Sequence, residues 1–344
     1  MLRLKHFEFW NTHIFHLPVY LYWLYLSLKA RSPFFFSAAN PGIENGGLMG
    51  ESKFEILKKT DSRFIPKTIF FKDIPDLETT LGKTYEANIR FPFVVKPDIG
   101  QGGWLIDLIR DEKDLINFLL RIKIPFMIQE YVDLPVELGI LYYRFPGEKK
   151  GVISSVATKD MLFVTGDGRR SVLELMKSNR RASRQLTRLM KSTRVDLHRI
   201  PDIGEKISLS FVGNHSYGTA FRNANHLIDE PLTKQFDSLC NDIAGFYFGR
   251  FDIRCESVSA LKEGRFSILE LNGVGSEPLH IFDPSEKLMN AYRCEFRHWK
   301  IIYKISRLNI SKEAPRMKLS EALDTYKNVL RIQRLHGTGF TIEN

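Results

Sequence analysis

Two short stretches of sequence decide the fold, Arg250-Phe251-Asp252-Ile253-Arg254 and Ser267-Ile268-Leu269-Glu270-Leu271-Asn272-Gly273. The first alternates polar and apolar residues, and the second does so from Leu269 onward, which is the pattern of a strand with one buried face. Side chains two residues apart point to the same side of a strand, so Asp252 shares a face with Arg254. Glu270 shares a face with Asn272 for the same reason. If the two strands are neighbours, their polar faces meet.

These faces would bring together the oxygen atoms of Asp252, Glu270 and Asn272. Mg²⁺ prefers hard oxygen ligands and is commonly bound by one or two carboxylates together with nucleotide phosphates. Mn²⁺ suits similar ligands. Arg254 beside the site would offset the charge of a phosphate group in transfer. The alternative interpretation is an ordinary hairpin with a solvated polar face.

An apolar strand further upstream leads into a glycine-rich loop, Phe93-Val94-Val95-Lys96-Pro97-Asp98-Ile99-Gly100-Gln101-Gly102-Gly103. The strand would deliver Lys96 to a phosphate. Gly100, Gly102 and Gly103 would let backbone N–H groups approach phosphate oxygens closely. The stretch matches neither a P-loop nor a dinucleotide-binding fingerprint. A plain hairpin turn is the alternative.

A third motif follows, Met127-Ile128-Gln129-Glu130-Tyr131-Val132-Asp133-Leu134-Pro135-Val136-Glu137-Leu138-Gly139. A strand that ends near Glu130 and Val132 can present a carbonyl or carboxylate and a backbone N–H to the edge of an adenine ring. Glu137 would accept hydrogen bonds from ribose hydroxyls. By itself, this motif is equally well a strand and a turn.

Taken in order, VVKP with its glycine-rich loop, IQEYV followed by VELGI, FDIR and ILELNGVGS resemble the ATP-grasp superfamily. The resemblance extends over roughly 51–283 and is strongest to the branch of D-alanine–D-alanine ligases, glutathione synthetases and cyanophycin synthetase. The segments 164–175 and 213–218 resemble the same enzymes, although Tyr217 stands where they commonly have Arg. The resemblance implies an α+β fold in which two lobes with antiparallel sheets hold the nucleotide between them.

The resemblance also implies roles for residues toward ATP. Lys96 would hold an ATP phosphate, and the loop of Gly100, Gly102 and Gly103 would close over it. The adenine ring would lie between Glu130 and Val132, and the ribose on Glu137.

By the same resemblance, Asp252, Glu270 and Asn272 would ligate magnesium, with Arg254 on phosphate or acylphosphate. Lys96 and Arg254 would therefore be the catalytic residues. The turn 273–276 would offer backbone N–H groups to a bound carboxylate or oxyanion.

The activity that the resemblance implies is that of an ATP-dependent carboxylate–amine or carboxylate–thiol ligase. A carboxylate attacks the γ-phosphate to give an acylphosphate, and the amine then displaces phosphate. The expected partners are therefore Mg²⁺-ATP and small-molecule or peptide carboxylates and amines. A kinase on the same scaffold and a non-catalytic nucleotide-binding module remain as alternatives.

Composition limits the remaining choices. The chain has 344 residues, of which 43% are hydrophobic and 26% charged, as in globular proteins. A formal charge of +10 favours anionic partners. Nucleic acid is disfavoured because no aromatic residues interleave with the basic stretch 177–194. Three widely spaced cysteines predict neither disulfides nor a zinc site and suit the reducing cytoplasm.

The segment Ile14–Leu28, IFHLPVYLYWLYLSL, is almost wholly apolar, and Lys29 and Arg31 follow it. It is shorter than the roughly 20 residues of a spanning helix. Two interpretations stay open. One is a helix beginning near Pro18 and buried against the main domain. The other is peripheral contact with a membrane interface, which favours aromatic and basic residues side by side.

We expect an aromatic N-terminal segment at 1–50, the catalytic domain at 51–310 and a helical tail at 311–344. Phe34-Phe35-Phe36 is expected as a buried strand. A single basic helix is expected to carry Lys177, Arg180, Arg181, Arg184, Arg188, Lys191 and Arg194. It is either a solvated lid face or a landing surface for a polyanion or anionic lipid. The other expected helices are 51–59, 111–122, 229–246, 288–305 and 319–335. The expected strands include 93–95, 126–132, 137–144, 151–157, 249–255 and 265–272.

Overall fold

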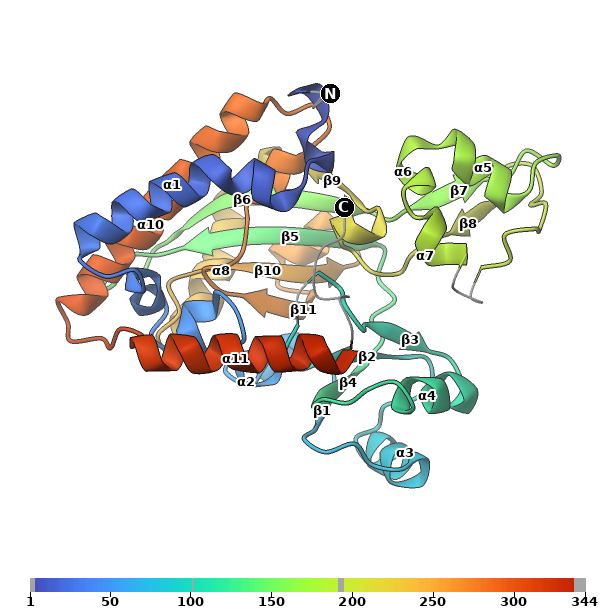
Figure 1. Cartoon of the computed structure of the whole chain (residues 1–344), viewed down its shortest axis with the longest axis horizontal. Helices are drawn as coiled ribbons and strands as arrows, with labels where there is room; N and C mark the ends of the chain where they lie inside the picture. The colour runs from blue at the N-terminus through green and yellow to red at the C-terminus, as the bar shows by residue number, and fades with distance from the viewer. Residues whose placement is uncertain (1–3, 101, 191–194, 337–344) are drawn as a thin grey trace.

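Two large antiparallel sheets organise the chain (Figure 1) in a computed structural model that describes residues 4–100, 102–190 and 195–336. The first sheet has the strand order β1-β4-β2-β3 and the second β11-β10-β5-β6-β9. The α+β class expected from the sequence is therefore confirmed. The strands are β1 Thr68–Phe71, β2 Phe93–Pro97, β3 Asp107–Ile109, β4 Phe126–Glu130, β5 Val136–Tyr143, β6 Val152–Asp160, β9 Ala220–Asn223, β10 Phe248–Cys255 and β11 Ser267–Asn272.

The four-stranded sheet buries one face under two helices, α3 Leu77–Glu86 and α4 Glu112–Leu119. Phe93 and Val95 of β2 point into that core, so the alternate residues Val94 and Lys96 point to the opposite face. The side chain of Asp111 caps α4 by accepting from the N–H of Asp114. The alternation of side chains along β2 thus directs Lys96 away from the apolar core.

The five-stranded sheet is covered on both faces. Helices α8 Glu230–Asp242 and α9 Val258–Lys262 cover one face, where Phe251 and Ile253 of β10 are buried. Helices α1 Thr12–Ala30 and α10 Leu288–Ile310 cover part of the other face. The rest of that second face carries the alternate, polar residues of β10 and β11.

The predicted pairing of the two deciding stretches is confirmed. Strands β10 and β11 are antiparallel neighbours, with Asp252 opposite Glu270 and Arg250 opposite Asn272. A bulge follows the Asp252 pair, so that Ile253 lies opposite Ile268. In the sequence, Ile268 and Leu269 are consecutive apolar residues, which breaks the alternation. The bulge leaves Leu269 unpaired, so that Ile268 and Leu271 both lie on the core face.

The N-terminal helix corrects the prediction that it begins near Pro18. Helix α1 begins at Thr12, where the Asn11 side chain accepts a hydrogen bond from the N–H of His13, and Pro18 lies inside it. Proline has the helical φ but lacks the N–H that would bond the Ile14 carbonyl, so the helix continues through it with one bond fewer. Among the described residues, none of the helices is both long and apolar enough to cross a membrane.

The predicted strand at residues 34–36 is wrong, since a 3₁₀ helix spans Phe35–Ala39 and is fully buried. It packs against α10, and Asn309 of α10 donates to the carbonyl of Ala38 at 2.8 Å. Helix α2 Lys53–Leu57 lies inside the expected range 51–59, and α11 Leu319–His336 extends one residue beyond the expected range 319–335. Ile332 of α11 is buried in the core of the four-stranded sheet.

The expected single basic helix is also wrong. The stretch forms three short helices, α5 Val172–Ser178, α6 Arg180–Ser183 and α7 Leu186–Met190, which pack beside a two-stranded sheet of β7 Phe163–Thr165 and β8 Lys206–Ser208. Asn179 breaks the helix because its backbone is extended and its side chain caps α6. Lys191 and Arg194 lie outside the described residues.

The three arginines of this stretch nearest Asn179 have a partner that sequence reasoning did not find. The guanidinium groups of Arg180, Arg181 and Arg184 lie 5.3, 4.9 and 4.6 Å from the ring centroid of Phe9. Cation–π contacts of this kind join the small α5–α7 unit to the N-terminal segment.

Phe251 tests the core of the larger lobe. Its ring is fully buried and lies 5.3 Å from Phe236 and 5.6 Å from Phe246, measured between ring centroids. We expect Phe251→Ala to lower the free energy of unfolding by about 3–5 kcal/mol, because it leaves a cavity. The measurement is urea denaturation. Leu120→Ala, at a side chain that is 76% exposed, is the control and should change stability by less than about 0.5 kcal/mol. Equal effects of the two substitutions would contradict this account of the core.

Candidate functional site

A cavity of about 360 Å³ lies between the two large sheets, and both contribute to its walls. The four-stranded sheet supplies Lys96 and Gln129, and the five-stranded sheet supplies Asp252 and Glu270. The size is within the range of sites that hold small molecules. The cavity therefore meets the expectation that two antiparallel lobes face a common site.

Two lysines bind to β11 beside this cavity, and the first of them, Lys96, connects the two lobes. Lys96 donates to Oε1 of Gln129 and to the carbonyl of Leu269 on β11, each at 2.9 Å. Burial lowers the pKa of Lys96 to about 8, and nearby Lys53 lowers it further while Glu270 opposes the change. Lys53, at the start of α2, forms an ion pair with Glu270. Burial alone would lower the pKa of Lys53, but Glu270 outweighs it and raises the pKa.

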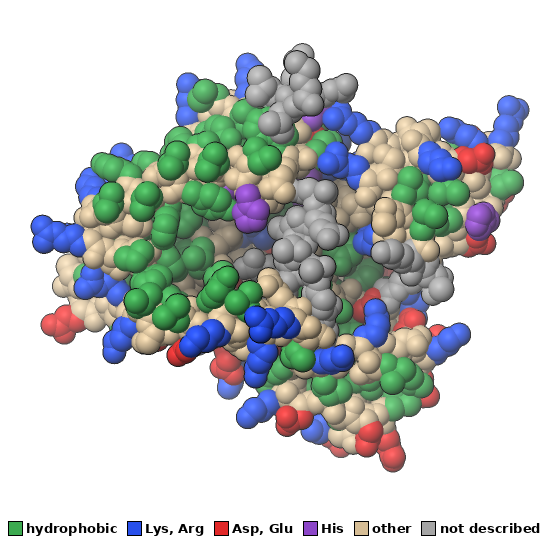
Figure 2. Space-filling view, viewed as in Figure 1, with side chains coloured by type: hydrophobic (Ala, Val, Ile, Leu, Met, Phe, Trp, Pro, Cys, Tyr) green, Lys and Arg blue, Asp and Glu red, His purple; other side chains and the backbone are tan. Residues whose placement is uncertain are grey.

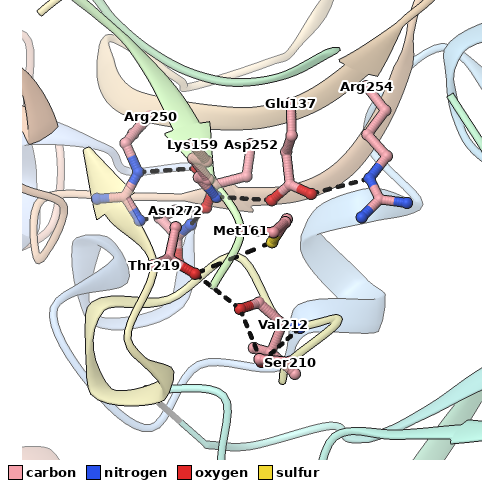
Figure 3. A network of polar contacts seen from close by, with 10 residues as sticks. All are labelled: Glu137, Lys159, Met161, Ser210, Val212, Thr219, Arg250, Asp252, Arg254 and Asn272. Atoms are coloured by element: carbon pink, nitrogen blue, oxygen red, sulfur yellow. Dashed lines mark hydrogen bonds and ion pairs between the residues drawn. The ribbon is translucent and has the colours of Figure 1, made fainter. Parts of the chain in front are cut away.

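Asp252 is the centre of the polar network (Figure 3). Its carboxylate accepts from Lys159 Nζ at 3.0 Å and from Arg250 Nε at 3.1 Å. The Asn272 amide lies 3.2 Å from Asp252 Oδ2. Burial alone would raise the pKa of Asp252, but Arg250 and Lys159 outweigh it and lower the pKa to about 2. The carboxylate is therefore ionised at neutral pH.

Arg254 lies apart from the Asp252–Glu270 pair. It donates to Glu137 Oε2 at 2.8 Å and to the carbonyl of Val132 at 2.6 Å. Lys159 bridges the two groups, because its Nζ is 3.2 Å from Glu137 Oε1 as well as 3.0 Å from Asp252. The position expected for Arg254, against Asp252, is occupied by Arg250. Both arginines share the face of β10 that carries Asp252, two residues to either side of it.

The residues proposed to contact adenine and ribose lie together at one end of the cavity. Glu130, Val132 and Glu137 all line it. Glu130 ends β4, and its backbone N–H donates to the carbonyl of Lys67. The Val132 carbonyl is bonded to Arg254, which fixes the direction of the chain between β4 and β5.

The described part of the glycine-rich loop also reaches the cavity. Gly100, Gly102 and Gly103 line it, while Gln101 is outside the described residues. Gly103 has φ +81°, and a Cβ there would lie 2.8 Å from Val212 and 2.9 Å from the ring of Tyr217. Glycine is needed at this position for both reasons. The Tyr217 hydroxyl donates to the Gly103 carbonyl at 3.0 Å, so the tyrosine that replaces the expected arginine contacts the loop.

The turn after β11 corrects one expectation. The backbone N–H groups of Val274 and Gly275 donate to the carbonyls of Gly46 and Gly47. They are therefore not available to a bound carboxylate. The close approach of the two loops requires glycine, because a Cβ on Gly273 would lie 2.7 Å from the Cα of Gly47. The loop that ends the aromatic N-terminal segment is thus fastened to the site.

The N-terminal segment forms the other end of the cavity, with an aromatic wall. Phe7, Phe15 and Phe282 line it, and the rings of Phe15 and Phe7 stack at 5.6 Å. His16 forms an ion pair with Glu277 beside this wall. Burial alone would lower the pKa of His16, but Glu277 outweighs it and raises the pKa to about 9. A histidinium–carboxylate pair therefore lies at the edge of an apolar compartment.

The donor set can be compared with what Mg²⁺ needs. Asp252 and Glu270 face each other on adjacent strands, and Asn272 adds an amide whose Nδ2 donates to Asp252 and whose oxygen is the atom able to bind a metal. In the parts of the chain that the structure describes, no three acidic, histidine or cysteine side chains form a ready metal cluster. Two carboxylates and an amide fit a magnesium ion that completes its shell with water and phosphate oxygens.

Sequence reasoning missed four side chains of this site. Arg250 was detectable by the same two-residue spacing that identified Arg254. Lys53, Gln129 and Lys159 reach the cavity from α2, β4 and β6. Their approach depends on how distant segments pair, which no local pattern in one sequence reveals.

Comparisons with known proteins give only distant similarities. No protein-family model matches the chain, and a search of curated proteins finds no match. Among solved structures, D-alanine–D-alanine ligase from Bacillus anthracis matches with a TM-score of 0.43 and 15% identity, over 78% of this chain and 70% of that one. VanG D-Ala:D-Ser ligase from Enterococcus faecalis matches with a TM-score of 0.42 and 16% identity, over 75% and 62%.

The bifunctional glutathione synthetase from Pasteurella multocida matches with a TM-score of 0.35 and 17% identity, over 71% of this chain. This chain spans only 35% of that enzyme's length. Likeness at this level assigns neither activity nor substrate. A functional proposal must therefore rest on the side chains of the cavity.

Lys159 tests the buried network. Lys159→Met removes a cation shared by two buried carboxylates, and we expect the free energy of unfolding at pH 7 to fall by about 3 kcal/mol. The pKa of Asp252 lies below its usual value, so its stabilisation is present at neutral pH and is lost as the pH falls toward 2. Loss of Lys159 raises that pKa, so the deficit of the variant should shrink as the pH is lowered from 7 to 4.

The control is Lys234→Met, which breaks an exposed ion pair with Glu230 and should change stability little at any of these pH values. Urea denaturation at several pH values measures both variants. A deficit for Lys159→Met that is constant with pH, or equal to that of the control, would contradict the network.

Proposed function

We propose that this protein is an ATP-grasp enzyme that uses Mg²⁺-ATP to join a carboxylate to an amine, with an acylphosphate as intermediate. One observation carries the proposal. Asp252 and Glu270, with Asn272 beside them, face Lys96 of the opposite lobe across a cavity that also holds the glycine-rich loop. Paired carboxylates, a buried lysine and flexible backbone donors are what Mg²⁺-ATP requires.

The nucleotide would lie between the lobes. Lys96 is buried and reaches the cavity, where its ammonium group would bind a phosphate, and Gly100, Gly102 and Gly103 would cover the phosphates from above. Glu130 and Val132 would hold the adenine edge. Glu137, kept in place by Arg254 and Lys159, would accept from ribose.

Magnesium would be held by Asp252, Glu270 and Asn272. When bound, it would offset negative charge on the phosphates as the γ-phosphoryl group is transferred. In the protein, Asp252 is paired with Lys159 and Arg250, and Glu270 with Lys53. These three cations therefore keep the carboxylates ionised and ready for the metal.

The carboxylate substrate would enter from the aromatic end of the cavity. Arg250 is positioned to contact this carboxylate. Its guanidinium group donates to Asp252 in the polar network and to the carbonyl of Glu277 beside the aromatic wall. We propose Arg250, rather than Arg254, as the residue that contacts the carboxylate and the acylphosphate. The wall of Phe7, Phe15 and Phe282 would hold the apolar body of the acid and keep water from the acylphosphate.

The chain's own contribution is positioning and charge compensation. Lys96 and Arg250 would bring the γ-phosphate and the carboxylate oxygen together and balance the charge shared between them. The carboxylate oxygen would attack the γ-phosphorus and ADP would leave. An amine would then attack the acylphosphate carbon and displace phosphate.

Turnover tests this proposal. The purified protein with Mg²⁺-ATP is offered pools of amino acids, short peptides and hydroxy or fatty acids, and the release of ADP and phosphate is measured. We expect pool-dependent release that falls by more than about a hundredfold in Asp252→Asn and in Glu270→Gln. Asp324→Asn, at a carboxylate that is 76% exposed on α11, is the control and should keep full activity.

The products distinguish the alternatives. A ligase releases free phosphate, whereas a kinase leaves the phosphate on its product. Failure to bind Mg²⁺-ATP at all would show that the proposal is wrong.

The pH dependence of nucleotide binding provides a second test. The charged form of Lys96 would bind phosphate, and its pKa in the free protein is lowered to about 8. Affinity should therefore be nearly constant below about pH 7 and should fall about twofold by pH 8 and about tenfold by pH 9. Lys96→Arg stays charged throughout and should show little change between pH 7 and 9. Isothermal titration calorimetry measures both. The same pH profile in the two proteins would argue against phosphate binding by Lys96.

A further inference from the structure

Helix α1 exposes a continuous apolar stripe on its outer face. The exposed large side chains are Ile14, Leu17, Tyr20, Leu21, Leu24, Tyr25 and Leu28. Ile14, Leu17, Leu21, Leu24 and Leu28 are three and four residues apart, so they form one line along the helix. Leu21 is 64% exposed and Leu28 73% exposed. The opposite face of the same helix, with Phe15, Val19 and Leu26, is buried.

The apolar surface extends beyond α1. Figure 2 shows hydrophobic side chains gathered along α1 and again over the beginning of α11, on the same face of the molecule. The exposed apolar residues in that part of α11 are Leu319, Leu323 and Tyr326. Contiguous exposed apolar surfaces of this kind mark places where a protein meets a partner or a membrane.

The charges around this surface indicate its partner. From Thr12 to Leu28, α1 has no Asp, Glu, Lys or Arg. Helix α10 packs beside α1, with the rings of Tyr22 and Phe296 5.0 Å apart. The outer face of α10 exposes five bases in one line, Arg293, Arg297, Lys300, Lys304 and Arg307. The one acidic residue of α10, Glu295, is buried. An apolar ridge therefore lies beside a basic ridge.

We propose that α1 docks this protein on the surface of a membrane that contains anionic lipids. The leucines of α1 would enter the boundary between headgroups and acyl chains, and Tyr20 and Tyr25 would lie at headgroup level. The basic line of α10 would contact lipid phosphates. Pairing with a second copy of the chain is disfavoured, because it would bring two basic ridges to the rim of one interface.

This inference is independent of the proposed ligase activity. The apolar stripe and the basic line belong to the outer faces of α1 and α10, whereas the cavity is lined by the inward residues Thr12, Phe15 and His16 of α1. Variants of the outer face should therefore leave nucleotide binding unchanged.

Co-sedimentation of the full chain with vesicles tests the proposal. Vesicles of phosphatidylcholine alone are compared with vesicles that also contain phosphatidylglycerol. We expect tight binding only to the anionic vesicles, weakened by salt. Leu21→Asp with Leu24→Asp should reduce binding by more than about a hundredfold, since it removes two inserted side chains and adds like charge. Arg297→Gln with Lys304→Gln should reduce it by more than about tenfold.

Leu120→Asp, at the exposed leucine that follows α4, is the matched control and should bind like the wild type. Leu28→Asp, at the end of α1, is the second variant if the double substitution lowers the melting temperature. Absence of binding to anionic vesicles would overturn the proposal, as would unchanged binding by all α1 variants. A dimer in solution that Leu21→Asp with Leu24→Asp dissociates would also overturn it, because it would identify a second copy as the occupant.

Discussion

The buried ion network around Lys159 is the interaction on which the rest of the site depends. Its ammonium group lies between Asp252 of β10 and Glu137 at the start of β5, while Arg250 and Arg254 hold the outer sides of the two carboxylates. Burying charges costs free energy unless each has a partner, and here every carboxylate has two. The network thus fixes two carboxylates inside the protein, at positions where the proposed nucleotide and metal would contact them.

The same constraint connects the two lobes. Lys96 of the four-stranded sheet bonds to the backbone of β11, and Lys53 of α2 pairs with Glu270. Side chains from both lobes therefore meet on one pair of strands. A ligand that competes for Lys96 would alter the contact between the lobes, so the proposed nucleotide binding would be coupled to their relative position.

Local alternation and apolar runs predicted strands β2, β4, β5, β6, β10 and β11, and they identified the polar faces that carry Asp252 and Glu270. The short strands β3, β7, β8 and β9 were not predicted. The sequence could not reveal Lys53 or Lys159, because their approach depends on the pairing of distant segments. Alternation placed Arg254 on the same face of β10 as Asp252, but it could not show that Arg254 pairs with Glu137 while Arg250 contacts Asp252. Two helix boundaries differ from the prediction. Helix α1 continues through Pro18, where tertiary packing overrides the local preference, and the predicted basic helix ends at Asn179, whose side chain caps α6.

The most direct test of the central claim is a crystal structure with Mn²⁺ and a non-hydrolysable ATP analogue, in which the anomalous signal locates the metal. The account predicts a manganese peak in contact with oxygens of Asp252 and Glu270, and a nucleotide phosphate in contact with Lys96. A nucleotide bound outside the cavity, or a metal that contacts neither carboxylate, would contradict it.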